Sequence, residues 1–321
     1  MSIGVRICHH DSQGMRNDAV ILKQAMEKKY SNIDVQIVEY PESSLYKQGN
    51  QLTEVTHQFF LEHINPSLVS SAKYNIYIPN PEWLSSNDLR IAESTLISKI
   101  IAKTKSGYEL LKLKFGSKVH FWGWTSIDRL DETVWKTFDE CLHIKGCSAF
   151  KNSQMVLDTW LQHPEWPMLH VVSYGNLEQN GFIEVKRTYV NIADNVRLYQ
   201  RKLNDSELTT LMNRAGIHIC PSQMEGFGHY INEAKSCGSY VITTNGNPMN
   251  ELIHETHGEL VDPQSFKTQA LSKRYFLDSK TLETVIDRTL KVPQTDLVSM
   301  AKKARESYLL DKNIFEENVI I

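Results

Sequence analysis

The sequence predicts an α/β protein made of two successive domains, each with its own parallel β-sheet. Short apolar runs alternate with helical patterns along the chain, which is typical of parallel sheets. Near residue 139 the pattern starts again, and a chain of 321 residues with 41% hydrophobic residues can form two cores. We therefore expect a first domain at residues 1–138, a second at 139–300 and a C-terminal helix at 301–321.

In the first half, apolar runs of strand length are separated by helical segments. A polar loop at residues 9–17 follows the first run, and Pro79-Asn80-Pro81 ends the third, because proline has no amide proton for a sheet. The expected strands are residues 3–8, 33–38, 74–78, 99–102 and 118–121, and the expected helices are residues 18–29 and 106–114.

The second half follows a connection at residues 123–139. Residues 204–206, Asn-Asp-Ser, offer caps for the start of one helix, and Gly238 is typical of the end of another. The expected strands are residues 141–144, 169–172, 196–199, 217–220 and 240–243, and the expected helices are residues 153–162, 206–215, 230–237, 281–290 and 296–309.

Composition excludes several classes of protein. The net charge of −3 and the absence of a Lys/Arg block argue against a nucleic-acid partner. The five cysteines form no C-x-x-C pair, which argues against a disulfide framework or zinc site and for a reducing compartment. No apolar run approaches the roughly 20 residues that span a bilayer, and the N-terminus is too short and polar for a signal peptide. We expect a cytoplasmic protein, and its oligomeric state stays open.

The most informative segment is residues 220–233, CPSQMEGFGHYINE, which runs from a strand end through a glycine loop into a helix. Ligands of open α/β sheets bind at the carboxyl ends of the strands, and glycines let the backbone approach them closely. Free amides at a helix start suit a diphosphate. Glu225 and Glu233 flank this loop. Because carboxylates repel phosphate, we expect them to accept hydrogen bonds from sugar hydroxyls.

Glu225 and Glu233, with the seven residues between them, resemble the E-x7-E motif of retaining GT-B glycosyltransferases, especially glycosyltransferase family 4. Residues 234–244 and 245–253 are similar to the continuation of that motif, so the likeness covers about thirty residues. The resemblance implies two Rossmann-like domains facing a central cleft, the first for the acceptor and the second for the sugar nucleotide. It also implies that the C-terminal helix crosses back onto the first domain.

The resemblance assigns roles around the motif. Glu225 is expected to touch the transferred sugar and Glu233 to hold the ribose of the nucleotide. The backbone of Gly226, Phe227 and Gly228 is expected to contact the sugar and the diphosphate. The alternative for Glu233 is a glutamate on a solvated helix face.

Residues 142–151 resemble the strand and loop that open the donor domain. The family places an arginine and a lysine there to neutralise the leaving diphosphate. Lys151 fits the lysine and is, with Glu225, our catalytic candidate, whereas Cys147 stands in place of the arginine. Lys145 or a residue of the first domain is an alternative source of that charge. The other donor-binding candidates named by place are Gly14, Gly146, Ser148, Arg201 and Lys202.

The first half supplies candidates for the acceptor cleft. Asn80 and Glu82 follow a strand end where the family often carries an active-site histidine, and Lys103 follows the strand at residues 99–102. The side chains of Trp83, Trp122 and Trp124 are able to stack on a sugar ring, but burial in a core is the commoner fate of tryptophan.

Metal and redox cofactors are not expected. No D-x-D triplet, the usual metal handle of the other main glycosyltransferase fold, is present, and no H-x-x-x-H pair suggests a metal site. No G-x-G-x-x-G follows a strand, which argues against hydride transfer. The nucleoside-diphosphate sugar would be a substrate rather than a resident cofactor.

These observations predict a metal-independent, retaining glycosyltransferase (EC 2.4) that acts on a glycan, lipid-linked or other hydroxyl acceptor. Peripheral contact with a membrane is compatible with a lipid-linked acceptor. Because no residue stands out as a nucleophile, same-face displacement is favoured over double displacement. The alternatives are a sugar-nucleotide epimerase, a phosphorylase, or a non-catalytic subunit that binds a sugar nucleotide, the last because the arginine is missing.

Overall fold

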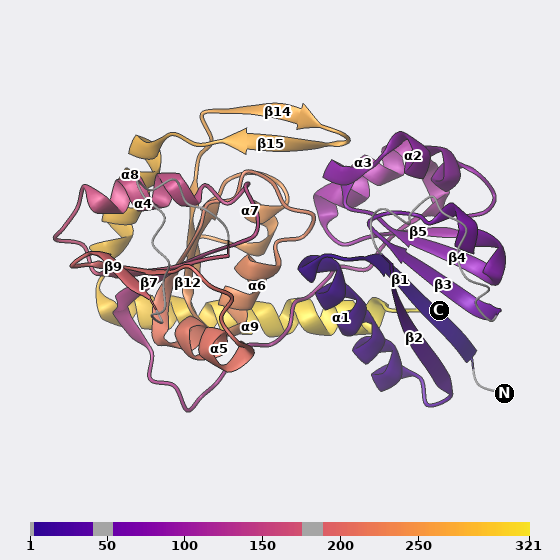
Figure 1. Ribbon diagram of the computed structural model, residues 1–321, viewed down its shortest axis with the longest axis horizontal. Helices are drawn as coiled ribbons and strands as arrows, with labels where there is room; N and C mark the ends of the chain where they lie inside the picture. Colours follow the sequence, from indigo (N-terminus) through magenta and orange to yellow (C-terminus); the bar gives the residue numbers. More distant parts are fainter. Residues whose placement is uncertain (1–2, 41–53, 175–188) are drawn as a thin grey trace.

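The computed structural model describes residues 3–40, 54–174 and 189–321, which form two α/β domains side by side (Figure 1). The first domain holds a six-stranded parallel sheet in the order β2-β1-β3-β4-β5-β6. Its strands are β1 (Ile3–His10), β2 (Ile33–Tyr40), β3 (Val55–Leu61), β4 (Ala72–Ile78), β5 (Lys99–Ala102) and β6 (Val119–Phe121). Its α-helices are α1 (Gln13–Lys29), α2 (Ser86–Glu93) and α3 (Lys105–Phe115).

The second domain holds a seven-stranded sheet in the order β13-β12-β11-β7-β8-β10-β9, in which only β9 runs antiparallel. Its strands are β7 (Thr137–Gly146), β8 (Met168–Ser173), β9 (Val190–Ala193), β10 (Val196–Tyr199), β11 (Ala215–Cys220), β12 (Tyr240–Thr244) and β13 (Gly258–Val261). Its helices are α4 (Ser153–Leu161), α5 (Asp205–Arg214), α6 (His229–Ser236), α7 (Met249–Leu252) and α8 (Ser279–Leu290). A separate hairpin consists of β14 (Ser265–Gln269) and β15 (Ser272–Phe276).

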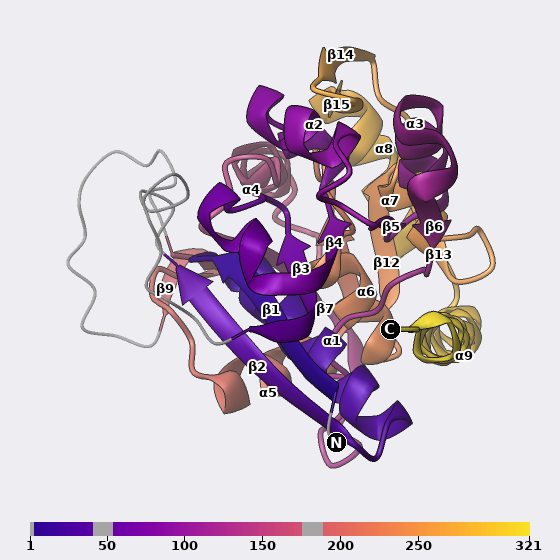
Figure 2. The same ribbon diagram turned by 90° about the vertical axis from the view of Figure 1, so that its right-hand side faces the viewer.

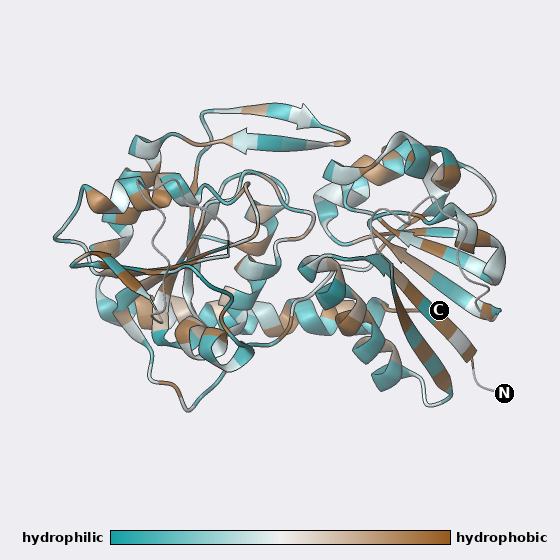
Figure 3. Ribbon diagram, in the orientation of Figure 1, coloured by the Kyte–Doolittle hydropathy of each residue, from teal (hydrophilic) through white to brown (hydrophobic). Residues whose placement is uncertain are grey.

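Apolar strands form the centre of each domain, and helices cover their faces (Figure 3). The central strands read as nearly continuous apolar runs because parallel sheets are covered on both sides. All six residues of β11 and all five of β12 are buried. Side-chain caps fix the helix starts: Asn204 and Glu207 form a capping box at α5, and the Thr104 hydroxyl accepts a hydrogen bond from an amide of α3.

The last helix, α9 (Gln294–Asn318), spans both domains (Figures 1 and 2). Its middle packs beneath the second domain, where Lys235 pairs with Asp311 at 2.7 Å. Its end reaches the first domain, where Phe315 packs against Trp124 with ring centroids 4.7 Å apart. None of the helices in the described ranges is both long and apolar enough to cross a bilayer.

The structure corrects some predicted elements. Helix α1 begins at Gln13, inside the predicted polar loop, because Ser12 caps it by accepting a hydrogen bond from Met15 N. Gly14 therefore lies in the first turn of a helix and not in a loop. Strand β3 was not predicted, since it carries the polar but buried Gln58, whose side chain bonds Arg6 and Asn75. The β14–β15 hairpin was also missed, because its first strand is largely exposed and shows no apolar alternation.

Candidate active site

The carboxyl ends of both sheets face each other across a cavity of about 200 Å³ between the domains. In open α/β sheets this edge is where ligands bind. The predicted site residues that line the cavity are Gly14, Asn80, Glu82, Lys103, Ser148, Glu225, Gly226, Phe227 and Gly228. Residues from both halves of the sequence thus meet in one place, although no spacing in the sequence links them.

The glycine loop connects β11 to α6 and forms one wall of this cavity. Gly228 has a φ of 106° and precedes the helix, a conformation that a residue with a side chain rarely adopts. A Cβ at Gly226 would clash with the side chain of Asn80 from the first domain. Phe227 is buried and packs edge-on against His229. The loop therefore needs both glycines, one for its backbone geometry and one for the close approach of the other domain.

Glu225 and Lys151 form an ion pair beside this loop, with both side chains largely buried. The Ser222 hydroxyl donates to the same carboxylate at 2.5 Å, and the Lys151 ammonium lies 3.4 Å from the centre of the Tyr230 ring. Both catalytic candidates from the sequence are therefore in direct contact, although 74 positions separate them. The pair is neutral overall, and it places the Lys151 ammonium beside the first turn of α6, whose N-terminus favours an anion.

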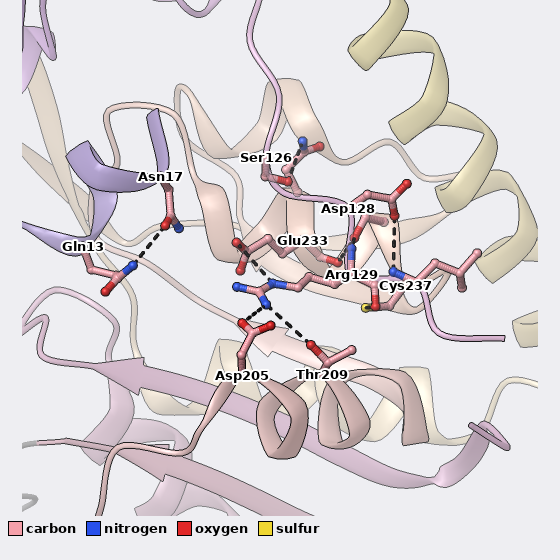
Figure 4. A network of polar contacts seen from close by, with 12 residues as sticks. Gln13, Asn17, Ser126, Asp128, Arg129, Asp205, Thr209, Glu233 and Cys237 are labelled. Atoms are coloured by element: carbon pink, nitrogen blue, oxygen red, sulfur yellow. Dashed lines mark hydrogen bonds and ion pairs between the residues drawn. The ribbon is translucent and has the colours of Figure 1, made fainter. Parts of the chain in front are cut away.

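Glu233 lies one turn into α6 and is buried, so the alternative of a solvated helix face is wrong. Burial raises the pKa of its carboxyl, and the nearby Arg129 opposes that shift. Arg129 Nε lies 3.8 Å from Glu233 Oε1, and Figure 4 shows the guanidinium between Glu233 and Asp205. Sequence reasoning missed Arg129, which stands in the connection between the domains without any motif around it.

The remaining donor-binding candidates lie around the carboxyl edge of the second sheet. Gly146 ends β7 with a φ of 57°, and Cys147 after it is exposed. Arg201 pairs with Glu207 at 2.6 Å, so its guanidinium lies against the first turn of α5. Lys202 is exposed. Gly146, Lys151, Arg201, Lys202 and Glu233 do not line the cavity described above.

The first domain contributes a buried carboxylate that the sequence did not reveal. Asp18 on α1 pairs with Lys103 at 2.9 Å and with His229 of the second domain at 2.8 Å, and Trp124 Nε1 also donates to it. Although burial alone would raise the pKa of Asp18, Lys103 and His229 hold it well below its usual range. Lys103 is therefore neutralised by Asp18, and the partners of Asp18 lie 85 and 211 positions away in the sequence.

A second polar group of the first domain surrounds Asn80. Glu62 pairs with His10 at 3.0 Å and accepts a hydrogen bond from Asn80 Nδ2 at 2.5 Å. Asn80 Oδ1 and Glu82 Oε2 are buried and have no hydrogen-bond partner among the described residues. Because native proteins rarely leave such atoms unpaired, both are open to a polar ligand in the cavity that they line.

Glu82 is the most perturbed carboxyl of this group. Burial, with nearby Glu62 and Glu225, raises its pKa to about 8. A carboxyl whose pKa is higher in the folded state than in the unfolded state keeps its proton in the folded protein at pH values where the unfolded chain has already lost it. The contribution of Glu82 to stability must then fall as the pH rises from about 4.5 to 8, by at most about 1.4 kcal/mol per pH unit.

We therefore expect Glu82→Gln, which cannot ionise, to be more stable than the natural protein at pH 8 and to lose that advantage near pH 4.5. Urea unfolding across this pH range measures the difference. Glu132→Gln, at an exposed position, is the matched control and should leave the pH dependence unchanged. If the free energy of unfolding of Glu82→Gln depended on pH in the same way as that of the natural protein, Glu82 would not titrate in this window.

The three tryptophans considered for stacking on a sugar ring differ in their burial. Trp122 and Trp124 are buried in the core. Trp83 is 41% exposed, lines the cavity and lies 6.0 Å from the Phe150 ring of the second domain, measured between centroids. Of the three, Trp83 alone is placed to contact a ligand in the cavity.

Further contacts join the two domains around the cavity. Glu251 on α7 accepts hydrogen bonds from the amides of Lys105 and Ser106 at 2.7 and 2.8 Å, which caps α3 of the other domain. The tip of the β14–β15 hairpin reaches across as well, since Leu271 N donates to Pro81 O at 3.1 Å (Figure 1). The structure therefore represents a closed arrangement of the domains. Within the described ranges, no three His, Cys, Asp or Glu side chains converge as metal ligands.

Comparison with known proteins agrees with this geometry. Residues 149–291 match the family described as Glycosyl transferases group 1. No curated protein matches the chain at a significant level. Among solved structures, HepE of Anabaena, in complex with UDP and glucose, is 14% identical over 97% of each chain, with a TM-score of 0.66.

Two further structures are similar over nearly the whole chain. A glycosyltransferase from Rickettsia africae is 11% identical, with 98% of this chain and 96% of that chain covered and a TM-score of 0.70. Sucrose-phosphate synthase from Thermosynechococcus elongatus is 12% identical, with 96% and 94% covered and a TM-score of 0.66. These likenesses confirm the predicted GT-B fold. With the group 1 domain, they also confirm the predicted enzyme class, a glycosyl-transferring enzyme (EC 2.4).

Proposed function

We propose that this chain moves a sugar from a nucleoside-diphosphate sugar to a hydroxyl group of a glycan, lipid or other acceptor, with retention and without a metal or other cofactor. The Glu225–Lys151 ion pair carries the proposal, because it stands at the glycine loop where α6 begins and its Glu225 lines the interdomain cavity. A lysine and a helix N-terminus together favour a leaving diphosphate. The complex of HepE with UDP and glucose supports such a donor on this fold.

In the proposed reaction, the bond between the anomeric carbon and the diphosphate oxygen breaks, and a bond to the acceptor oxygen forms on the same face. The acceptor proton passes to the leaving phosphate oxygen. Lys151 stabilises the charge that develops on the diphosphate, and Glu225 holds Lys151 in place and accepts from a hydroxyl of the transferred sugar. Catalysis then rests on orientation and on electrostatic stabilisation.

The carboxylates of the cavity support same-face displacement over double displacement. Asp18, Glu62 and Glu225 are each paired with a basic side chain, which makes them poor nucleophiles. Glu82 has no such partner, but a pKa of about 8 keeps it protonated near neutral pH. Each carboxyl group among the described residues that line the cavity is therefore either paired with a basic side chain or protonated. This arrangement fits the retaining enzymes of family 4 that the E-x7-E segment resembles.

The test is turnover of UDP-, GDP- and dTDP-glucose by the purified chain, with and without excess EDTA. We expect one donor to release nucleoside diphosphate at a rate that EDTA does not change. Activity lost on chelation and restored by Mn²⁺ or Mg²⁺ would contradict metal independence. An isomerised sugar nucleotide would indicate an epimerase, phosphate dependence a phosphorylase, and binding without turnover a non-catalytic subunit.

A further inference from the structure

The β14–β15 hairpin crosses from the second domain to the first (Figure 1). Its tip is anchored to the first domain, because the Leu271 amide donates to Pro81 O at 3.1 Å and the Leu271 side chain packs against the core of that domain. Its base is anchored to the second domain, where the Tyr275 amide donates to Gln223 O at 2.8 Å. The hairpin is therefore held in one position beside segments of both domains that line the cavity.

The hairpin is strongly basic, although the net charge of the chain is −3. Residues 265–276 include Lys267, Lys273 and Arg274 but neither aspartate nor glutamate. Lys267 and Arg274 stand directly opposite each other on the two strands, so their side chains share one face, whereas Lys273 belongs to the other face. None of the three pairs with a carboxylate of the described residues. Because like charges directly opposite each other destabilise a sheet, an anion bound between Lys267 and Arg274 would be favoured.

The face that carries Lys267 and Arg274 is turned towards the cavity. Gln269 belongs to this face, and its Nε2 atom lies 3.5 Å from Glu82 O in the first domain. The Arg274 guanidinium lies 4.8 Å from the centre of the Phe150 ring, measured from Cζ. Since Glu82 and Phe150 both line the cavity, this face of the hairpin adjoins the proposed site of sugar transfer.

The guanidinium of Arg274 is fixed in position but keeps free donors. Its Nε atom donates to Gln223 Oε1 at 2.7 Å, whereas its two terminal nitrogens bond no other described residue. The centre of the Phe276 ring lies 5.1 Å from Arg274 Cζ and 5.6 Å from Lys267 Nζ, so both cations surround one ring. A planar guanidinium with a free edge can bind a carboxylate or a phosphate through two parallel hydrogen bonds, and a neighbouring ammonium adds a second positive charge.

The size of the cavity requires a large acceptor to extend beyond it. Its volume of about 200 Å³ is smaller than the roughly 300–1,000 Å³ of typical ligand sites. Trp83 of the first domain and Phe150 of the second lie on its wall, with ring centroids 6.0 Å apart. An acceptor that leaves the cavity past these two rings would bring its next substituent to Arg274, which stacks on Phe150.

We propose that Lys267 and Arg274 bind a phosphate or carboxylate group of the acceptor, so that the enzyme selects acceptors with a negative charge near the accepting hydroxyl. The proposal rests on the proposed function, because it assumes that a hydroxyl acceptor enters the cavity. Lys267 and Arg274 are specificity residues in this role and take no part in bond breaking.

Two other anionic partners fit the hairpin less well. The donor diphosphate already has Lys151 and the N-terminus of α6 in the proposed reaction. An anionic membrane would have to reach Lys267 and Arg274, but the face that carries them is turned towards the cavity and not away from the protein.

Calorimetric titration in the presence of nucleoside diphosphate tests the proposal. UDP, GDP and dTDP are titrated first, and the one that binds is kept in excess so that the donor site is filled. Glucose, glucose 6-phosphate and glucuronic acid then serve as neutral, phosphorylated and carboxylated probes. We expect at least one anionic probe to bind about tenfold or more tightly than glucose, since it gains charge-assisted hydrogen bonds. Comparison of the two anionic probes shows which of the two groups the site prefers.

Substitutions on the hairpin identify the residues responsible. Arg274→Gln removes the charge and should weaken the preferred anionic probe about tenfold. The double variant Lys267→Gln/Arg274→Gln should bind the anionic probe no more tightly than glucose. Lys273→Gln is the matched control, because it removes a neighbouring cation on the opposite face and should leave the preference unchanged. The affinity for nucleoside diphosphate should be the same in each of these variants.

The proposal would be overturned, and the proposed function left standing, if the natural protein bound neither anionic probe more tightly than glucose. A preference that survives in the folded double variant, or an equal loss in Lys273→Gln, would also overturn it. Weaker binding of nucleoside diphosphate by Arg274→Gln would assign Arg274 to the donor instead. Binding to phosphatidylserine vesicles that is lost in the double variant, without a preference for an anionic probe, would assign the hairpin to a membrane. A natural protein that binds no nucleoside diphosphate would overturn the proposed function, and this proposal with it.

Discussion

Replacing Lys151 with alanine should lower kcat for the preferred donor by about 10²–10³-fold, the typical loss when one electrostatic stabiliser of a transition state is removed. Lys151 is the cation that pairs with Glu225 beside the start of α6. Its charge acts mainly as the diphosphate leaves, so the loss should appear in kcat more than in affinity for free nucleoside diphosphate. Steady-state kinetics and calorimetry on the same variant separate the two quantities.

The controls distinguish charge from folding. Lys151→Ala leaves Glu225 largely buried without its cation, so the single variant should also be less stable. The double variant Lys151→Ala/Glu225→Gln removes both charges and should regain stability but not turnover. Glu225→Gln alone should lower turnover and leave nucleotide affinity nearly intact. If nucleotide affinity, melting temperature and turnover fall together in Glu225→Gln, and in Ser222→Ala as well, Glu225 only braces the loop.

Replacing Asp18 with alanine should destabilise the protein by about 3–5 kcal/mol, because it leaves the ammonium of Lys103 buried and unpaired. The side chains of Asp18 and Lys103 are 1% and 3% exposed, so solvent cannot substitute for the lost partner. Asp18 also binds His229 across the cleft, and its loss should loosen the closed arrangement. Urea unfolding measures the stability change.

Asp11 provides a matched control on the same segment. Its side chain is 57% exposed and pairs with Arg16 at 2.6 Å on the surface, where an ion pair contributes about 0–1 kcal/mol. Asp11→Ala should therefore change stability little. Similar losses in Asp11→Ala and Asp18→Ala would contradict the buried role assigned to Asp18. Asp18→Ala combined with Lys103→Met removes both charges and should recover part of the stability.

The part of the site with the strongest signal in the sequence lies within one short segment. The segment from Glu225 to Glu233 combines a strand end, a glycine loop and a helix start, and each of these leaves a local signal. Parallel strands such as β11 and β12 were predictable for the same reason, since both faces are buried and the apolar run is continuous.

What escaped prediction depends on tertiary contacts. Asp18 becomes a central residue only because Lys103 and His229 pack against it. Arg129 stands in an irregular connection, where neither periodicity nor a motif marks it. The β14–β15 hairpin forms outside both sheets, and its contact with Pro81 joins residues that are distant in the sequence. No local pattern in the sequence encodes such pairings, because they arise from packing within the first domain and from how the two domains close on each other.

Sugar transfer from a nucleotide donor with retention determines which anomer the enzyme releases first. In the absence of an acceptor, slow hydrolysis of an α-linked nucleotide glucose by concentrated enzyme can be followed by proton NMR before the free sugar equilibrates. We expect α-glucose to appear first and Lys151→Ala to suppress its formation. Release of β-glucose first, or no consumption of any donor, would contradict this expectation.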